Sequence, residues 1–385
     1  MKTLPDNPNL DHLRRQAKDL LSGLRDSEPG TTLARAQASL AGQYGFASWP
    51  ELKAEVDRRR DTAETADPRL ARDLAERFGL GEVIEPMRSL ARPDESGRRW
   101  SLRTGRGRWA VRTMDTWHAI VDAETEVALQ EAALDRGVAL PVPVRGRSGA
   151  LVEEVGGHSW RVCEWPHSGP PLSAPVGAAA CRQVGEILAI LHGLRLPVDR
   201  VSPWHLHRHR CQSWPGLAAE ARSRHAPWSD ELDKAVAVLT ELETVGAGEP
   251  APEVVVLTHN SLGPGNARHG RDGRLVVTGW EHAGGQPPAW ELAEALMNWC
   301  VDPDGGVNAA GARALVEGYG PARTLQLGDF RGAVTSLDNY VSGQVWVALE
   351  ASIGEDLRFA ERNMRHLLTH LPNLAALERL LTVTS

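Results

Sequence analysis

One stretch in the second half of the chain constrains the fold more than any other. Residues 254–258 form one apolar run and residues 275–280 a second, and between them lies a loop rich in Gly and Pro that runs from His259 to Asn266. Short apolar runs bounded by Gly and Pro are typical of buried strands. We therefore expect the two runs to pair as strands.

The order of residues in this stretch resembles a known enzyme family. It reads His-Asn-Ser-Leu-Gly-Pro-Gly-Asn at 259–266 and Thr-Gly-Trp-Glu at 278–281, and Pro-Pro-Ala-Trp-Glu-Leu-Ala follows at 287–293. Active members of the aminoglycoside phosphotransferase family, a branch of the protein-kinase-like fold, read H-G-D-x-x-x-x-N, I-D-[WF]-[ED] and P-x-x-[WD]-[DE]-L-A in that order. The resemblance extends over roughly residues 75–375. It implies a bilobal α+β fold with a ligand cleft between the lobes.

The rest of the chain divides into segments of different character. Residues 1–60 are predicted to form a small helical module, and residues 61–74 a charged linker. Residues 75–165 form the expected β-rich lobe, and residues 166–385 a mainly helical lobe. Periodicity predicts helices at 10–24, 33–43, from 48 onward, 124–134, 184–192, 231–242, 309–319, 334–351 and 355–371, and hairpins at 100–111 and 151–165.

Residues 1–60 also resemble a short helical segment that stands at the front of various bacterial proteins, often before ankyrin-type repeats. The shared pattern is Leu-x-x-Leu-Arg-x-Gln-Ala-Lys-x-Leu-Leu at 10–21, followed by Tyr-Gly-Phe-x-Ser-Trp-Pro at 44–50. This resemblance implies no activity. Contact with a protein partner is one role open to the module.

Two positions depart from the family pattern, and the family has an aspartate at both. In phosphoryl transfer of this class, one aspartate accepts the proton of the attacking hydroxyl, and a second joins the loop asparagine in holding magnesium. The resemblance places Ser261 at the first position and Gly279 at the second, so that only Asn266 remains. Serine is not a base at neutral pH, and glycine has no side chain. Since a positioned base is worth about 10²–10⁴ in rate, we expect the standard reaction to be lost.

The resemblance also implies a nucleotide-binding half. Arg112 stands where the family has the basic residue of the third strand, which contacts nucleotide phosphates, and Glu126 stands where it has that residue's acidic partner. Glu164 and Trp165 fall at the interlobe hinge, whose backbone would meet the adenine. The predicted β-rich lobe contains no lysine. Arg112 therefore has to serve, and it presents a rigid planar fork in place of a compact ammonium.

Three interpretations of the cleft stay open at this point. The first is a pseudokinase that binds a small molecule, nucleotide or peptide, as an accessory of biosynthesis or resistance. The second is an active O-phosphotransferase for a small hydroxyl compound or peptide, with ATP and with Mg²⁺ held by Glu281 and Asn266. The third is a different chemistry that uses Ser261, His259 and Glu281. We favour the first, because a longer glutamate would have to replace the missing aspartate in a tight metal geometry.

The overall charge excludes some classes of partner. The chain has 43 Lys and Arg against 50 Asp and Glu, a net charge of −7, which does not favour binding to nucleic acid or to an anionic membrane. No apolar run approaches the ~20 residues of a membrane helix. The first residues also lack the apolar core of a signal peptide. We therefore expect a cytoplasmic protein.

A histidine-rich stretch at 204–210 stands apart from the family pattern. His205, His207 and His209 alternate, so that on a strand they would share one face and could hold a metal ion. Arg208 and Arg210, which alternate with the last histidines, would repel a cation. We favour a solvated or anion-contacting basic loop.

Overall fold

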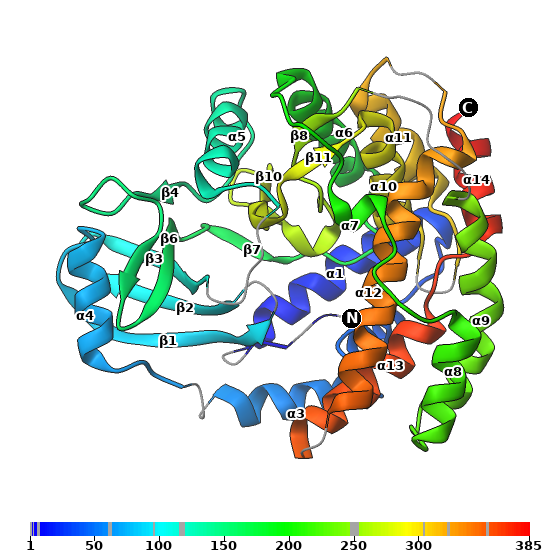
Figure 1. Cartoon of the computed structure of the whole chain (residues 1–385), viewed down its shortest axis with the longest axis horizontal. Coiled ribbons are helices and arrows are strands. Elements are labelled where there is room, and N and C mark those ends of the chain that lie inside the picture. The colour runs from blue at the N-terminus through cyan, green and yellow to red at the C-terminus, as the bar shows by residue number, and fades with distance from the viewer. Residues whose placement is uncertain are drawn as a thin grey trace.

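The structure is a computed structural model, and it describes residues 2–385 apart from residues 3, 6–7, 61–63, 95–96, 115–119, 247–253, 303–304, 322–323 and 352–353. Figure 1 shows a sheet lobe on the left and a larger helical lobe on the right, with the first helix, α1 (Leu10–Ser27), where the two lobes meet. The predicted α+β class and two-lobed arrangement are therefore confirmed.

The sheet lobe is built on an antiparallel sheet with the strand order β1-β2-β3-β6-β4, and β5 also pairs with β6. The two predicted hairpins, β2 with β3 and β5 with β6, are confirmed. Trp100 and Trp160 fill the core of this lobe. The strands are β1 (Val83–Asp94), β2 (Gly97–Thr104), β3 (Gly107–Thr113), β4 (Pro143–Val144), β5 (Glu153–Val155) and β6 (His158–Glu164).

Two helices accompany this sheet. Helix α5 (Ala123–Asp135) is the predicted one at 124–134. Helix α4 (Pro68–Arg77) begins inside the stretch 61–74 that was predicted as a linker. Its apolar face is short and surrounded by charges, which hides the helix in the sequence, yet Leu74 is fully buried in the core of the sheet lobe. Only the first part of the predicted linker thus precedes a regular element.

The helical lobe surrounds a core that includes Trp299, Phe330 and Leu188. The predicted helices are present, and the structure adds α7, α8, α10 and α14. Across the described residues, no helix combines the length and the apolar character that a bilayer crossing requires. The helices are α6 (Ala178–Leu194), α7 (Pro203–Leu206), α8 (Trp214–Ser223), α9 (Ser229–Glu243), α10 (Pro288–Cys300), α11 (Ala309–Tyr319), α12 (Arg331–Glu350), α13 (Gly354–Thr369) and α14 (Leu374–Thr384).

The predicted pairing of the two apolar runs in this lobe is wrong. Strand β8 (Val256–Thr258) pairs with β11 (Gly284–Gln286), and β10 (Leu275–Val277) pairs with β9 (Ala267–Gly270). The tight turn at residues 271–273 joins β9 directly to β10, so β10 already has its hairpin partner. The ends of the two runs still lie close together, because His259 after β8 contacts the Thr278 carbonyl after β10.

The N-terminal module consists of α1, α2 (Leu33–Gln43) and α3 (Trp49–Arg60), which confirms the predicted helices. The module packs against β7 (Ser168–Pro171) and the residues that follow it. Gln43 Nε2 donates to the Ala174 carbonyl at 3.1 Å, and Asp26 accepts the Ala178 backbone N–H at 3.0 Å. The module is thus bound to the segment that connects the two lobes. Its relation to ankyrin-repeat proteins stays a prediction.

Candidate functional site

His259 holds the loop that follows β8. The side chain is buried; its Nε2–H donates to the Thr278 carbonyl at 2.9 Å, and its Nδ1 accepts the backbone N–H of Ser261 at 3.3 Å. Burial lowers the pKa of His259 to about 4, so the ring is neutral at neutral pH. The third interpretation needs correction here, because the ring binds the amide of Ser261 and not its hydroxyl. A base that activates serine has to accept the hydroxyl proton.

A buried carboxylate on α10 fixes the start of the same loop. Glu291 accepts from Thr258 Oγ1 at 2.5 Å and from the Asn260 backbone N–H at 2.7 Å, and it lies 2.7 Å from His192 Nε2. Burial alone would raise the pKa of Glu291, but its hydrogen bonds with His192 and Thr258 hold that pKa below its usual value. The ionised Glu291 therefore anchors the loop backbone to α10.

Asn266 and Gly279 meet where the family pattern has its magnesium ligands. Asn266 Nδ2 donates to the Ser261 carbonyl at 2.9 Å and lies 3.3 Å from Ser261 Oγ. Gly279 has φ of +83°, and a Cβ atom there would lie 2.5 Å from Asn266 Oδ1. The structure thus brings these three predicted positions together. The amide of Asn266 takes the space that a side chain at position 279 would need.

The carboxylate of Glu281 is paired with arginines of the opposite lobe. Its Oε1 lies 2.6 Å from Arg112 Nη1 and 3.6 Å from Arg99 Nη2. Burial would raise the pKa of Glu281, but Arg112 and Arg99 outweigh it and hold the pKa far below its usual range. Burial would likewise lower the pKa of Arg112, but Glu281 and Glu126 raise it. The predicted phosphate and metal residues therefore form an ion pair with each other.

Glu126 is not the direct partner of Arg112 that its position predicted. Its Oε2 lies 2.6 Å from Arg161 Nη1 on β6, and its Oε1 accepts from Gln130 Nε2 at 2.7 Å. All of these side chains except Arg112 are almost fully buried. Arg161, which no family motif indicated, forms the ion pair with Glu126, and Arg112 pairs with Glu281 instead.

The hinge also differs from the prediction. The N–H of Glu164 donates to the Val142 carbonyl at 2.8 Å, and the N–H of Trp165 donates to the Arg108 carbonyl at 3.0 Å. Both donors are thus used within the sheet lobe and do not point to a ligand. The guanidinium of Arg108 lies 3.6 Å from the centre of the Trp165 ring and covers that aromatic face.

The described residues do not fit a magnesium ion. Mg²⁺ needs hard, negatively charged oxygen ligands in near-octahedral geometry. Three positions could supply magnesium ligands. Gly279 has no side chain, Asn266 offers only a neutral oxygen, and the charge of Glu281 is already neutralised by Arg112. In the part of the chain that the structure describes, no cluster of His, Cys, Asp and Glu could hold a metal ion either.

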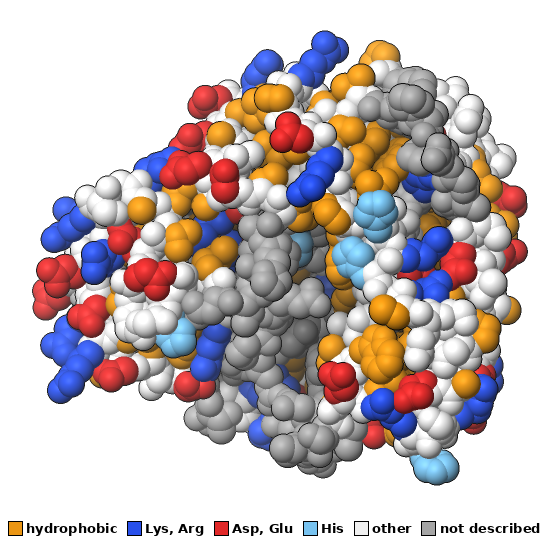
Figure 2. Space-filling model, viewed as in Figure 1, with side chains coloured by type: hydrophobic (Ala, Val, Ile, Leu, Met, Phe, Trp, Pro, Cys, Tyr) orange, Lys and Arg blue, Asp and Glu red, His pale blue; other side chains and the backbone are white. Residues whose placement is uncertain are grey.

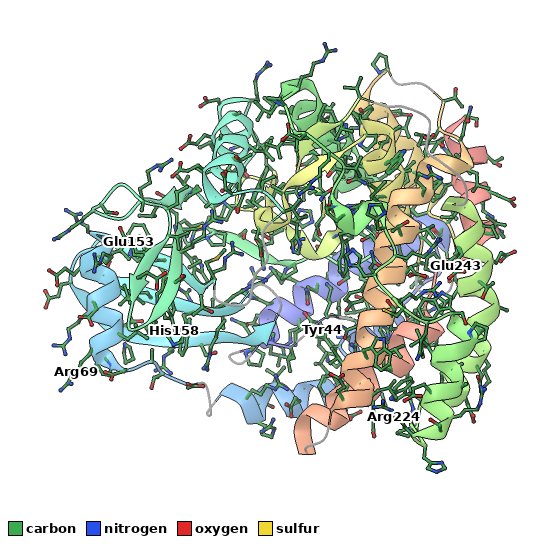
Figure 3. The ribbon with its side chains drawn as sticks, viewed as in Figure 1. Tyr44, Arg69, Glu153, His158, Arg224 and Glu243 are labelled. Carbon is green, nitrogen blue, oxygen red and sulfur yellow. The ribbon has the colours of Figure 1, made fainter. Side chains whose placement is uncertain are left out.

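The histidine-rich stretch does not form a strand with its three histidines on one face. It begins as the short helix α7, where His205 is buried and its Nε2 lies 3.2 Å from Glu294 Oε2, whereas His207 and His209 are exposed. Arg210 pairs with Asp338 at 3.1 Å, and Figure 3 marks Glu243, another acid at this loop. The arginine of this stretch is therefore bound to acids of its own chain, and a contact of the stretch with an external anion stays a prediction.

A cavity of about 1300 Å³ lies between the lobes, and its walls are cationic. They carry nine Lys or Arg side chains against four Asp or Glu, although the net charge of the whole chain is −7. On the outer surface of the sheet lobe, by contrast, basic and acidic side chains are interspersed (Figure 2). A local excess of positive charge inside an acidic protein favours an anionic ligand.

The sequence analysis did not single out four arginines of these walls that bear on the site: Arg99, Arg108, Arg161 and Arg268. A signal for two of them exists. Arg161 lies between the apolar residues of a predicted hairpin strand, and Arg268 follows directly on Asn266 and Ala267. Charged residues are rarely buried without a partner, so a charge within a buried strand marks a partner or a ligand.

Comparison with known proteins places this site in a family. A model of the phosphotransferase enzyme family matches residues 87–325. A homoserine kinase of Granulibacter bethesdensis is 29% identical over 271 residues, 68% of this chain and 79% of the relative. A homoserine kinase of Methylobacterium radiotolerans is 27% identical over 267 residues, again 68% of this chain and 79% of the relative.

Solved structures agree on the fold. A spectinomycin phosphotransferase in complex with ADP and spectinomycin superposes with a TM-score of 0.54 at 14% identity, covering 76% of this chain and 92% of that one. An amicoumacin kinase in complex with AMP-PNP and Ca²⁺ gives a TM-score of 0.52 at 12% identity, covering 83% and 96%. The predicted kinase-like architecture is therefore confirmed.

Proposed function

The chain belongs to the phosphotransferase enzyme family, and from that premise we propose that it binds a phosphate-bearing compound, such as a nucleotide, in the cleft between its lobes without ordinary metal-dependent phosphoryl transfer. A small hydroxyl compound would be the second ligand, as the substrate class of the family suggests. We place the protein in the cytoplasm, as the sequence predicts.

The observation that carries this proposal is the ion pair between Arg112 and Glu281. The pair joins the two lobes across the position where a magnesium ion would have to sit, and both side chains are largely buried. A metal ion at Glu281 would have to displace a guanidinium at 2.6 Å from the only carboxylate among these positions. Removing one partner from a buried pair costs about 3–5 kcal/mol, which opposes that exchange.

Anion binding does not need the metal. Guanidinium groups bind phosphate oxygens through two parallel hydrogen bonds and stay charged at every physiological pH. Arg99 and Arg112 share the one carboxylate of Glu281, so the three side chains keep a net positive charge at the centre of the cavity. A phosphate group can therefore be held by these arginines directly.

The names of the relatives favour a second candidate, an active ATP-dependent O-phosphotransferase. The relatives at 26–29% identity are named homoserine kinases, and their substrate is a small hydroxyl amino acid. For this chain, such activity requires that Arg112 leave Glu281 and that transfer proceed without a carboxylate base. A loose transition state makes the base less important than charge neutralisation, which keeps this candidate testable.

Calorimetric titration of the full-length chain with ATP tests the proposal. We expect the same affinity in excess EDTA and in Mg²⁺, and no transfer of radiolabel from ATP to homoserine. The double variant Arg112→Gln with Glu281→Gln should bind at least about tenfold more weakly, because it removes the cation without leaving its carboxylate partner buried and unpaired.

A surface pair provides the matched control for that variant. Arg182 and Glu317 form an ion pair on exposed parts of the helical lobe, and replacing both with Gln should leave ATP binding unchanged. Labelled phosphohomoserine that forms only with Mg²⁺ would establish the second candidate in place of the first. Failure of the wild type to bind ATP under either condition would refute both.

A further inference from the structure

The N-terminal module supplies one wall of the interlobe cavity. Residues of α1, His12 and Asp19 among them, line the same cavity as Arg112 and Glu281. The module is held there by polar contacts: Gln16 Nε2 donates to the Pro171 carbonyl of β7, and Tyr44 donates to Gln16 Oε1 at 2.9 Å. Figure 3 shows Tyr44 near the middle of the molecule, where the lobes meet.

The cavity wall also contains an arginine, Arg268, that has no acidic partner among the described residues. Arg268 lies on β9, which pairs with β7. Its Nη1 donates weakly to the Gly169 carbonyl at 3.4 Å, and its Nε is buried without a hydrogen-bond partner. Among the described residues no carboxylate lies within ion-pair distance of Arg268. A buried cation without a counter-charge is costly unless a ligand supplies one.

We propose that Arg268, together with His12 of α1 and Arg108 of β3, forms a second oxyanion subsite that binds a phosphate group at the hinge end of the cavity. The N-terminal module would then be a part of the ligand site, and not a separate appendage. The three side chains come from three elements that are far apart in the sequence but line one cavity. This inference rests on the cleft ligand of the proposed function, and it adds a second anionic group to that ligand.

The electrostatics of the neighbouring side chains agree with the geometry. Burial and the charge of Arg99 lower the pKa of Arg268 to about 10. Burial and the charge of Arg268 lower the pKa of Lys2 to about 7. Burial, Arg15 and Arg268 lower the pKa of His12. Each of these bases is thus made less basic by the positive charge of a neighbour, and a bound anion would relieve this repulsion.

The position of the subsite defines the class of ligand. It lies at the hinge, because Arg268 Nη1 donates to the Gly169 carbonyl of β7 and the Arg108 guanidinium lies over the Trp165 ring. The hinge N–H donors of Glu164 and Trp165 are used within the protein, and the Trp165 ring is covered by Arg108. The hinge end therefore suits a charged phosphate better than a flat uncharged base. A ligand with two phosphate groups satisfies both subsites.

Titration with inorganic pyrophosphate in excess EDTA tests this inference on the full chain. Arg268→Gln should weaken binding about tenfold, as expected for the loss of a charge-assisted contact. His12→Gln should weaken it less. Arg274→Gln is the matched control, because Arg274 lies on the neighbouring hairpin, exposed and paired with Asp272, and should have no effect.

Thermal melting without ligand separates a binding role from a structural one. If Arg268 serves a ligand, Arg268→Gln should melt at or above the temperature of the wild type, because an unpartnered buried cation is gone. Should the variant melt earlier, Arg268→Lys, which keeps the charge, must recover part of the lost affinity.

Wild-type pyrophosphate affinity in Arg268→Gln, or no recovery in Arg268→Lys where that variant is needed, would overturn the inference. Two further results distinguish it from the proposed function. If the double variant of Arg112 and Glu281 loses binding while Arg268→Gln keeps it, the cleft binds phosphate but the second subsite is refuted. If the wild type binds neither pyrophosphate nor ATP, both proposals are refuted.

Discussion

At the scale of single residues, the site differs from the family pattern in how charges are paired. Position in a motif predicted that Arg112 would face Glu126 and that Glu281 would be available to a metal ion. Instead Arg161 takes Glu126, and Arg112 takes Glu281. A motif fixes which residues lie near a cleft, but the choice of partner depends on Arg161 of β6, which no motif indicated. Gly279, where the family has an aspartate, also changes the site, because the amide of Asn266 takes the space that a side chain there would need.

The buried His259 predicts a measurable dependence of stability on pH. Its pKa in the folded chain is about 4, against 6.5 as the ordinary value, so between these pH values the unfolded chain binds a proton that the folded chain does not. The contribution of the neutral His259 to the free energy of unfolding is therefore fully present above pH 6.5 and is lost as the pH falls toward 4. The loss from this group is up to about 3 kcal/mol in the free energy of unfolding.

Urea denaturation across this range checks the value. His259→Asn should have a clearly smaller loss between pH 6.5 and pH 4 than the wild type. The exposed His207→Asn is the control and should follow the wild-type curve. Equal pH dependence in His259→Asn and the wild type would mean that the folded chain holds His259 in its ordinary protonation equilibrium.

At the scale of elements, the sequence predicted where most helices and strands lie but not which strands pair. The apolar runs that became β8 and β10 were recognised correctly, but they were paired with each other because both are short and close in sequence. The true partner of β8 is the segment Gly-Gly-Gln at 284–286, which has no alternating apolar pattern. Helix α4 was not predicted either, because charged residues surround its short apolar face.

Helices α6 and α11 pack at unusually close range through two glycines. A Cβ atom on Gly185 of α6 would lie 2.0 Å from the Leu315 carbonyl oxygen, and one on Gly318 of α11 would lie 2.1 Å from the Arg182 carbonyl oxygen. Backbone atoms cannot move aside as side chains do. We therefore expect Gly185→Ala to lower the free energy of unfolding by about 2–3 kcal/mol, measured by urea denaturation.

Gly193 on the same helix is the matched control. It is exposed, and a Cβ atom there meets nothing within 4 Å, so Gly193→Ala should leave stability unchanged or raise it by less than about 1 kcal/mol. If the two alanine variants proved equally stable, the close packing of α6 against α11 would be wrong.

At the scale of the whole molecule, the bilobal fold and the three N-terminal helices followed from the sequence, but their arrangement did not. Periodicity gives each helix an apolar face and says nothing about polar contacts such as that of Gln16 with the Pro171 carbonyl, 155 residues away. The docking of α1 beside the cavity rests on such contacts. The cationic cavity was likewise hidden, because a net charge of −7 sums over the whole chain and does not say where the charges lie.

The central claim is that an ion pair between Arg112 and Glu281, and not a metal ion, joins the two lobes. Crystals of the full-length chain soaked with ADP and Mn²⁺ test this directly, since Mn²⁺ scatters anomalously and occupies magnesium sites. We predict ADP phosphates against the arginines of the cavity, Arg112 still paired with Glu281, and no anomalous peak beside Glu281. An anomalous peak between Glu281 and Asn266, with Arg112 turned away, would contradict the account.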